Sequence, residues 1–227
     1  MNKVNQRSLI KAIIYKDWYF SKKLLVLFSS FGLVSVYLLS FENMAFYIGM
    51  VLLISIVIII GALLIFSTVV SERKKQTLPF LMSLPISYMD YTKAKLIFNL
   101  LTYFFTWLLL VVATIGIIFF TEHLPNGLIP YALIVLIELM VAFILVLATA
   151  LISESEIWTI VVMSINNIGV SLFIFLIASI RDISSFMKGP VAVWNSTALL
   201  IIVIEIIIAL VIIATTLYVQ SHKKDFI

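Results

Sequence analysis

The chain contains no cysteine, which excludes a disulfide framework and any metal or redox site built from thiolates. Charged residues are also scarce, at 11% of the 227 positions, whereas hydrophobic residues make up 63%. A soluble globule of this composition would expose far more apolar surface than its interior could bury. The sequence therefore excludes an ordinary soluble domain and predicts a protein whose solvent is lipid.

Motifs of enzyme chemistry are missing as well. The chain has two histidines, His123 and His222, and neither belongs to an H-E-x-x-H metal-binding pattern. It also lacks the G-x-S-x-G nucleophile motif and the G-x-x-x-x-G-K phosphate loop of ATP-hydrolysing proteins. We therefore predict no catalytic residue, no metal, no cofactor bound directly by this chain, and no nucleic-acid partner.

Long apolar runs recur along the whole sequence. Each exceeds about 18 residues, the length that an α-helix needs to cross roughly 30 Å of hydrocarbon. Runs such as residues 52–66, LLISIVIIIGALLIF, are apolar on every side, which favours helices over the alternating strands of a β-barrel. The predicted fold class is an all-α polytopic membrane protein with six transmembrane helices, expected at residues 24–41, 44–70, 96–120, 130–152, 157–180 and 197–219.

The basic residues predict the orientation of these spans. Thirteen of the fifteen Lys and Arg residues lie before the first span, between the second and third spans, or after the sixth. Because cytoplasmic segments carry an excess of Lys and Arg, both termini are expected in the cytoplasm of a cell inner or plasma membrane. Residues 24–219 then form one transmembrane domain, followed by a cytoplasmic tail at 220–227.

The N-terminal segment, residues 1–23, has a helical pattern of its own. At 100° per residue, Leu9 and Ile13 fall on one side and Arg7 and Lys11 fall opposite. This pattern is typical of an interfacial helix whose basic side meets lipid headgroups. The alternative is that these basic residues only mark the cytoplasmic side of the first span.

Four polar side chains interrupt the spans at bilayer depth. Glu138 and Glu205 are the acidic residues among them, and each must face protein or water, or bind a proton. A site for a transported proton or cation and a structural role near a tilted helix end both fit them. For Asn166 and Asn167 we favour packing against another helix, with a place on a translocation path as the alternative.

The longest predicted cytoplasmic connection, residues 71–95, has the residue order of a short helix. Thr77 is a suitable N-cap, Pro79 is tolerated in the first turn and Pro85 ends the segment. Its apolar side chains are Leu78, Phe80, Leu81 and Leu84. Either a soluble partner buries this apolar face, or the helix lies on the headgroups.

The charged exit at residues 72–75, the stretch QTLPFLMSLPIS and the entry at residues 91–95 resemble the loop after the second span in permease subunits of ABC-2 type ABC transporters. In that family the loop holds a coupling helix that docks on a cytoplasmic ATPase. The resemblance implies that Thr77–Leu84 is the coupling helix and residues 3–22 the connecting helix. The implied ATPase-contacting residues are Glu72, Thr77, Leu78, Phe80, Leu81 and Leu84, with Glu154 and Glu156 in a second contact.

The resemblance also implies the partners and the function. Two copies of an ATPase, which bind ATP and Mg, would drive two permease protomers, identical or homologous, within the lipid bilayer. The expected activity is export of a hydrophobic or amphipathic substrate, with bacterial peptides or toxins as the favoured cargo. Two alternatives remain open: an ion- or proton-coupled secondary transporter that uses Glu138 and Glu205, and a non-transporting membrane anchor or immunity protein.

Overall fold

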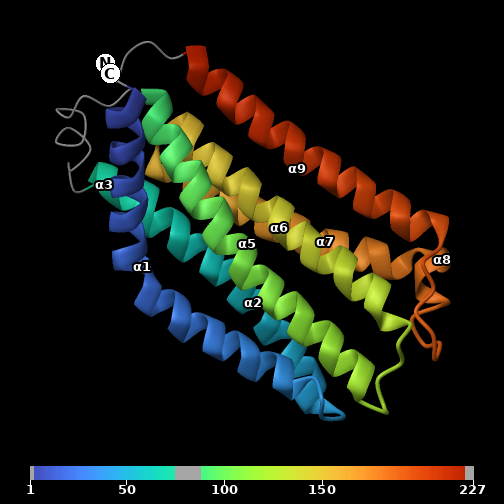
Figure 1. Ribbon diagram of the computed structural model, residues 1–227. Helices are drawn as coiled ribbons and strands as arrows, with labels where there is room; N and C mark the ends of the chain where they lie inside the picture. Colours follow the sequence, from blue (N-terminus) through green and yellow to red (C-terminus); the bar gives the residue numbers. More distant parts are fainter. Residues whose placement is uncertain (1–2, 75–87, 223–227) are drawn as a thin grey trace.

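The computed structural model describes residues 3–74 and 88–222, which contain helices and no strand. The helices, labelled as in Figure 1, are α1 (Lys3–Leu38), α2 (Met44–Ile65), the π-helix η1 (Phe66–Val70), α3 (Ser71–Lys74), α5 (Tyr88–Phe120), α6 (Leu128–Ser153), α7 (Glu156–Ser179), α8 (Arg181–Ser184) and α9 (Ser196–His222). Six of these elements are long and apolar enough to cross a membrane, where α2 and η1 count as one span. The prediction of an all-helical multi-pass membrane protein is therefore confirmed.

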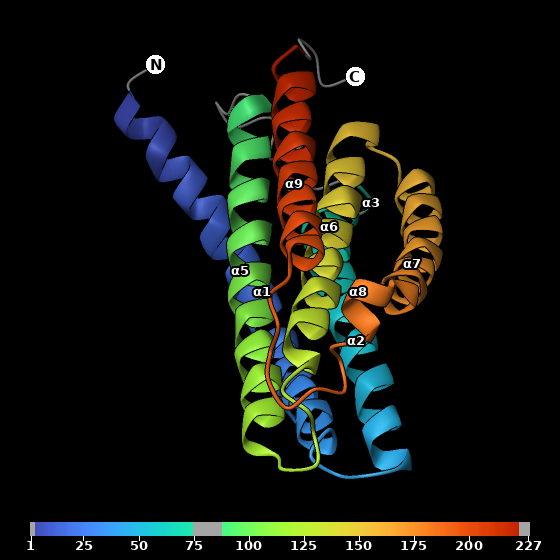
Figure 2. The same ribbon diagram turned by 90° about the vertical axis from the view of Figure 1, so that its right-hand side faces the viewer.

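Two helices extend beyond the membrane spans that the sequence predicted. The expected interfacial element and first span form one continuous helix, α1, whose first part leans away from the bundle (Figure 2). Helix α5 begins at Tyr88, eight residues before the predicted third span, so Lys93 and Lys95 belong to the helix and not to a loop. The S-x-x-D pattern of Ser87 and Asp90 predicts an N-terminal capping box at the start of this helix. Ser87 lies outside the described residues, and Asp90 lies in the first turn of α5.

Helix α6 is the centre of the bundle. It packs against α5, α7, α9 and α2, and α1 packs against α2 and α5. In the most apolar stretch of α6, 61% of the residues are buried, compared with 11% in α7 and in α9. Helices α7 and α9 therefore present most of their apolar surface outward, to lipid or to another subunit.

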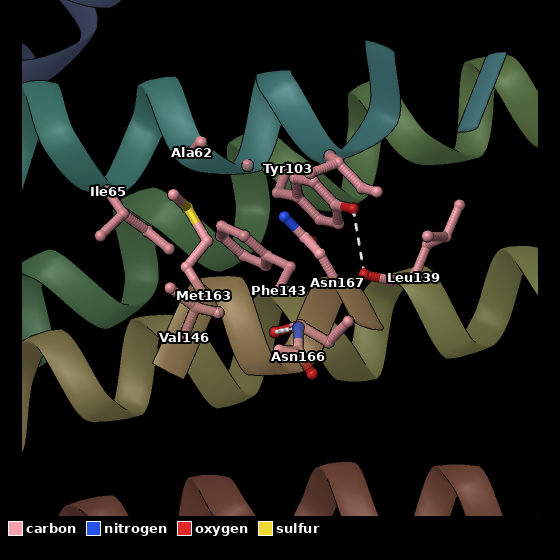
Figure 3. Close-up of a pocket in the computed structure, with 12 residues that line it drawn as sticks. Ala62, Ile65, Tyr103, Leu139, Phe143, Val146, Met163, Asn166 and Asn167 are labelled. Atoms are coloured by element: carbon pink, nitrogen blue, oxygen red, sulfur yellow. Dashed lines mark hydrogen bonds between the residues drawn. The ribbon is translucent and has the colours of Figure 1, made fainter. Parts of the chain in front are cut away.

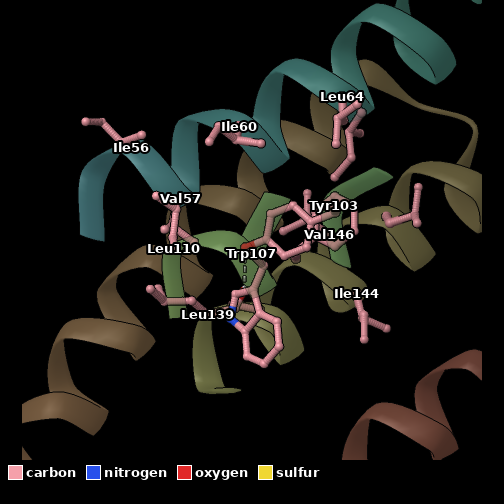
Figure 4. Close-up of a cluster of buried hydrophobic side chains, with 14 of the residues drawn as sticks. Ile56, Val57, Ile60, Leu64, Tyr103, Trp107, Leu110, Leu139, Ile144 and Val146 are labelled. Atoms are coloured by element: carbon pink, nitrogen blue, oxygen red, sulfur yellow. Dashed lines mark hydrogen bonds between the residues drawn. The ribbon is translucent and has the colours of Figure 1, made fainter. Parts of the chain in front are cut away.

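Aromatic side chains join α5 to α6 at the core (Figure 4). Tyr103 stacks on Phe143 with ring centroids 3.8 Å apart and donates from its hydroxyl to the Leu139 carbonyl at 3.2 Å. Trp107 donates from Nε1 to the Leu136 carbonyl at 2.6 Å. In lipid, such packing and interhelical hydrogen bonds replace the hydrophobic effect as the force that holds helices together.

The start of α1, α3, the start of α5 and the end of α9 lie at the same end of the bundle (Figure 1). We call this the terminal end. The turn between α6 and α7 is also there, because α6 and α9 both run toward it. At the opposite end, Asn195 caps α9 by accepting from the Ala198 amide at 2.8 Å, and Thr197 donates to Asp182 Oδ2 at 2.9 Å.

Candidate functional site

The last turns of α2 change from α to π geometry at the terminal end. In η1, Thr68 donates from its hydroxyl to the Leu64 carbonyl at 2.6 Å, and Ser71 donates to the Ser67 carbonyl at 2.5 Å. Such π segments are rare and occur often at functional sites, because the wider turn changes where the following side chains point. Here the following acidic side chain, Glu72, lies inside the bundle and is 6% exposed.

Glu72 belongs to a cluster of buried charges. The ammonium of Lys95, which is fully buried in α5, donates to Glu72 Oε1 at 2.7 Å and to Asp17 Oδ2 at 2.8 Å. Tyr91 donates from its hydroxyl to Glu72 Oε2 at 2.8 Å. Lys16 pairs with Glu72 Oε1 and lies 3.4 Å from Asp17 Oδ1. We call these five residues the charge cluster. It contains two acidic and two basic groups, so its formal charge is zero.

The electrostatic environment of Glu72 favours its ionised form. Burial alone opposes ionisation, but the positive charge of Lys95 and the hydrogen bonds from Lys16 and Lys95 outweigh it, so the pKa of Glu72 is lowered. A buried ion pair is not in itself strongly stabilising, whereas removal of one partner leaves an uncompensated buried charge that costs about 3–5 kcal/mol. The cluster therefore resists separation of the helices that carry it.

A polar pair continues the cluster about one turn deeper into the bundle. Asn99 donates from Nδ2 to Thr68 Oγ1 at 3.0 Å and to the Lys95 carbonyl at 2.9 Å. Both side chains are buried. Because buried amide and hydroxyl groups need partners, this pair fixes the rotation of α5 against η1.

The charge cluster includes residues that come shortly before and shortly after positions 75–87 of the chain, the segment that was predicted to hold the coupling helix. Glu72 lies in α3, which ends at Lys74, and Tyr91 and Lys95 lie in the first two turns of α5, which begins at Tyr88. Both flanks of the segment are thus bound to each other, and Asp17 binds them to α1. The cluster connects three elements at one point of the terminal end.

The remaining predicted coupling residues fall into two groups. Glu154 follows α6 in a left-handed conformation with φ 55°, and Glu156 lies in the first turn of α7, where the Ser155 side chain accepts from the Trp158 amide. This turn lies at the terminal end, as the coupling hypothesis requires. The predicted helix itself lies outside the described residues, with Thr77, Leu78, Phe80, Leu81 and Leu84, so its structure stays a prediction.

The two asparagines lie around a small pocket between α2, α5, α6 and α7 (Figure 3). Asn166 donates from Nδ2 to the Ala142 carbonyl at 3.2 Å, which agrees with the predicted packing role. The pocket, which Tyr103 and Phe143 also line, has a volume of about 30 Å³, room for about two water molecules. It is too small to hold a peptide.

The structure places Glu138 and Glu205 on two helices that pack against each other, and neither belongs to the pocket that the asparagines line. Glu138 lies on α6 and Glu205 on the neighbouring α9, and neither lines the asparagine pocket. Glu205 is 3% exposed. The two glutamates therefore lie on neighbouring helices, outside the asparagine pocket.

The sequence argument missed most of the charge cluster. Asp17 was not singled out, and Lys95 counted only toward the orientation of the spans. A signal was present, because Asp17 is the only acidic residue among the first 41, where six basic residues surround it. A single acidic residue in a basic helix is a candidate for a buried ion pair, but the sequence does not show which basic residue is its partner.

Comparison with known proteins gave no match to a family model, to a curated protein or to a solved structure. The site must therefore be interpreted from its own chemistry. Its charges are buried and paired with one another, and two of the three elements that they join, α3 and α5, flank residues 75–87. This arrangement is suited to the transmission of movement between elements.

Proposed function

We propose that this chain is the transmembrane permease subunit of an ATP-driven ABC exporter of the ABC-2 type. A separate ATPase, present in two copies with its ATP and Mg, docks on residues 75–87 and supplies the energy. The observation that carries this proposal is the charge cluster, which binds both flanks of that segment to α1 and α5. A loop that only connects two spans has no need for such an attachment.

The cluster gives the proposal a mechanical basis. A force on residues 75–87 reaches α3 and α5 directly, and through Asp17 it reaches α1. Separation of these helices would leave buried charges unpaired, so the helices are expected to move together. A force on the loop would then be transmitted to the helices instead of only deforming the loop. ATP-driven approach of the two ATPases would then shift the bundle between two packings that open the pathway to opposite sides.

Two further features support a pathway between two protomers. The asparagine pocket holds only about two waters, so it offers no route for a peptide through the chain. Helices α7 and α9 have outward apolar faces over most of their length, which a second permease copy would cover in part. The apolar surroundings fit a hydrophobic or amphipathic cargo, and peptides or peptide toxins are the proposed substrates.

Co-purification tests the proposal. The chain is co-expressed with the ABC ATPase encoded nearest to its gene, and both proteins are purified in mild detergent. We expect co-elution, and we expect its loss when Phe80 and Leu81 are both changed to Asp. The matched control is Phe120→Asp, because Phe120 is 83% exposed at the opposite end of α5. A complex that forms equally well with the double variant would refute the proposed docking segment. The absence of any complex with an ATPase would favour the carrier or anchor hypotheses.

A further inference from the structure

Helix α9 turns its polar side chains inward. Its buried residues are Ala198, Glu205, Thr216 and Gln220, while most of its large apolar side chains are exposed. A membrane helix that buries a carboxyl group must supply it with a partner, since an unpaired charge in a medium of low dielectric constant is very costly. The hydrogen-bond partners of these inward-facing polar groups therefore indicate whether each group has a structural role or a binding role.

Thr216 and Gln220 have protein partners, whereas Glu205 has none. Thr216 donates to the Ile212 carbonyl at 2.7 Å, and Gln220 donates from Nε2 to the Leu151 carbonyl at 2.7 Å. Both carboxyl oxygens of Glu205 are buried, and within the part of the chain that the structure describes neither has a hydrogen-bond partner. Each such unsatisfied group in a packed interior needs an explanation, for which an absent ligand is one candidate.

Helices α6 and α9 run in the same direction, and the hydrogen bond between Gln220 and Leu151 sets their register. Glu205 lies 15 residues before Gln220, and Glu138 lies 13 residues before Leu151. At 1.5 Å per residue, the two glutamates differ in depth by about 3 Å. Each lies about 14–15 Å from the start of its helix, which is near the middle of roughly 30 Å of hydrocarbon.

Within residues 3–74 and 88–222, no ion pair joins either of these two acids to a basic side chain. Helices α6, α7 and α9 contain no Lys or Arg, and those of α5 lie in its first two turns. Among the described residues, Glu138 is the titratable group whose charge acts on Glu205. The other titratable and charged groups described on α6, on α9 and on the elements packed against them lie toward the helix ends or have other contacts: Tyr47, Asp90, Tyr91, Lys93, Lys95, Tyr103, Tyr131, Glu156, Arg181, Asp182, Tyr218 and His222.

We propose that Glu138 and Glu205 form a proton-binding site at mid-bilayer depth, in which the two carboxyl groups share one dissociable proton. The proton binds to a carboxylate oxygen of one glutamate, and the resulting O–H donates to the carboxylate of the other. This arrangement gives the orphaned oxygens a partner and removes the repulsion between two like charges. Release of the proton to water restores both carboxylates, and no other bond changes.

A proton fits this location better than a metal ion. Magnesium and calcium require six or more oxygen ligands, and two carboxylates supply four oxygens at most. Loss of the proton would place two negative charges between α6 and α9, which would loosen their contact. The packing of α9 on the central helix is therefore expected to depend on protonation. This inference does not rest on the proposed ATPase partner, because the site is complete within one chain.

Infrared difference spectroscopy of the purified full chain in lipid nanodiscs tests the site. Spectra are recorded between about pH 5 and about pH 9, a range in which ordinary carboxyl groups are already ionised. We expect a protonated-carboxyl C=O band that disappears as the pH rises. Glu205→Gln and Glu138→Gln should each remove the pH-dependent band or shift the pH at which it disappears, because each variant takes away one of the two carboxyl groups. The matched control, Glu122→Gln in the exposed connection before α6, should leave it unchanged.

Every outcome decides the proposal. If Glu205→Gln does not fold, Glu138→Gln gives the same test, because the proton is shared. A protonated band that persists across the pH range would mean a permanently neutral structural pair and would overturn the site. So would a band that neither variant affects. The absence of any band, together with a rise in melting temperature that sodium or potassium causes in the wild type but not in Glu205→Gln, would replace the proton with a cation.

Discussion

Replacement of Lys95 by Met is the sharpest perturbation of the charge cluster. Methionine has nearly the length of the lysine side chain and removes only its ammonium group. Asp17 and Glu72 would then be two carboxylates, 3% and 6% exposed, without the cation that lies between them. Removal of one partner from a buried ion pair costs about 3–5 kcal/mol. Because about 1.4 kcal/mol is a tenfold change, the folding equilibrium constant should fall by roughly 10²–10⁴.

Reversible unfolding in mixed micelles, followed by tryptophan fluorescence and by helical content, measures this loss. The control is Lys93→Met, the same substitution two residues away on the exposed side of α5, which should change stability by less than about 0.5 kcal/mol. A triple variant, with Asp17→Asn and Glu72→Gln added to Lys95→Met, should recover part of the loss because it removes two buried carboxylates that Lys16 alone would have to neutralise. A Lys95→Met protein as stable as Lys93→Met would refute the argument that the cluster holds these helices together.

Three further predictions test the same account. Because the pKa of Glu72 is lower in the folded protein than in the unfolded chain, its ionised side chain stabilises the fold fully at a pH above the unfolded pKa. This stabilisation is lost as the pH falls through the folded-state pKa. Glu72→Gln should therefore flatten the acid side of a plot of stability against pH. Gly49→Val should destabilise the fold by about 1–3 kcal/mol, because a Cβ at this position would lie 2.9 Å from a backbone oxygen of α1. The control is Gly116→Val, which has open space around it and should cost less stability in the same unfolding assay. Trp107→Phe should lower the free energy of unfolding by about 1 kcal/mol, because it removes the hydrogen bond to the Leu136 carbonyl, and an equilibrium unfolding curve resolves this difference.

The membrane fold could be predicted from the sequence because each span satisfies its own backbone hydrogen bonds and must be apolar over its whole length. These are local properties, so the six spans were identified and only their ends were misplaced. The pattern of residues 1–23 predicted an interfacial helix leading into the first span, and α1 is one continuous helix that carries the charges of Lys16 and Asp17. The structure pairs those charges at the end of the bundle, so the helix continues through them.

The candidate site depends on long-range contacts that no local pattern contains. Lys95 and Asp17 are 78 positions apart in the chain, and Lys16 and Glu72 are 56 apart. Glu72 was singled out through its resemblance to a family position, which gave no information about its partners. The shared location of Glu138 and Glu205 likewise depends on the register of α6 and α9, which the bond between Gln220 and Leu151 fixes.

The central claim is that ATP binding by a partner moves this chain through residues 75–87 and the charge cluster. The absence of cysteine allows a single spin label at Lys93→Cys, on the exposed side of α5 near the cluster. The measurement is the label-to-label distance between the two permease copies of the purified ATPase complex, without nucleotide and with trapped ATP. We predict a change in distance on ATP trapping that Lys95→Met abolishes while the complex stays intact. A distance that ATP leaves unchanged, or a change that survives Lys95→Met, would contradict the account.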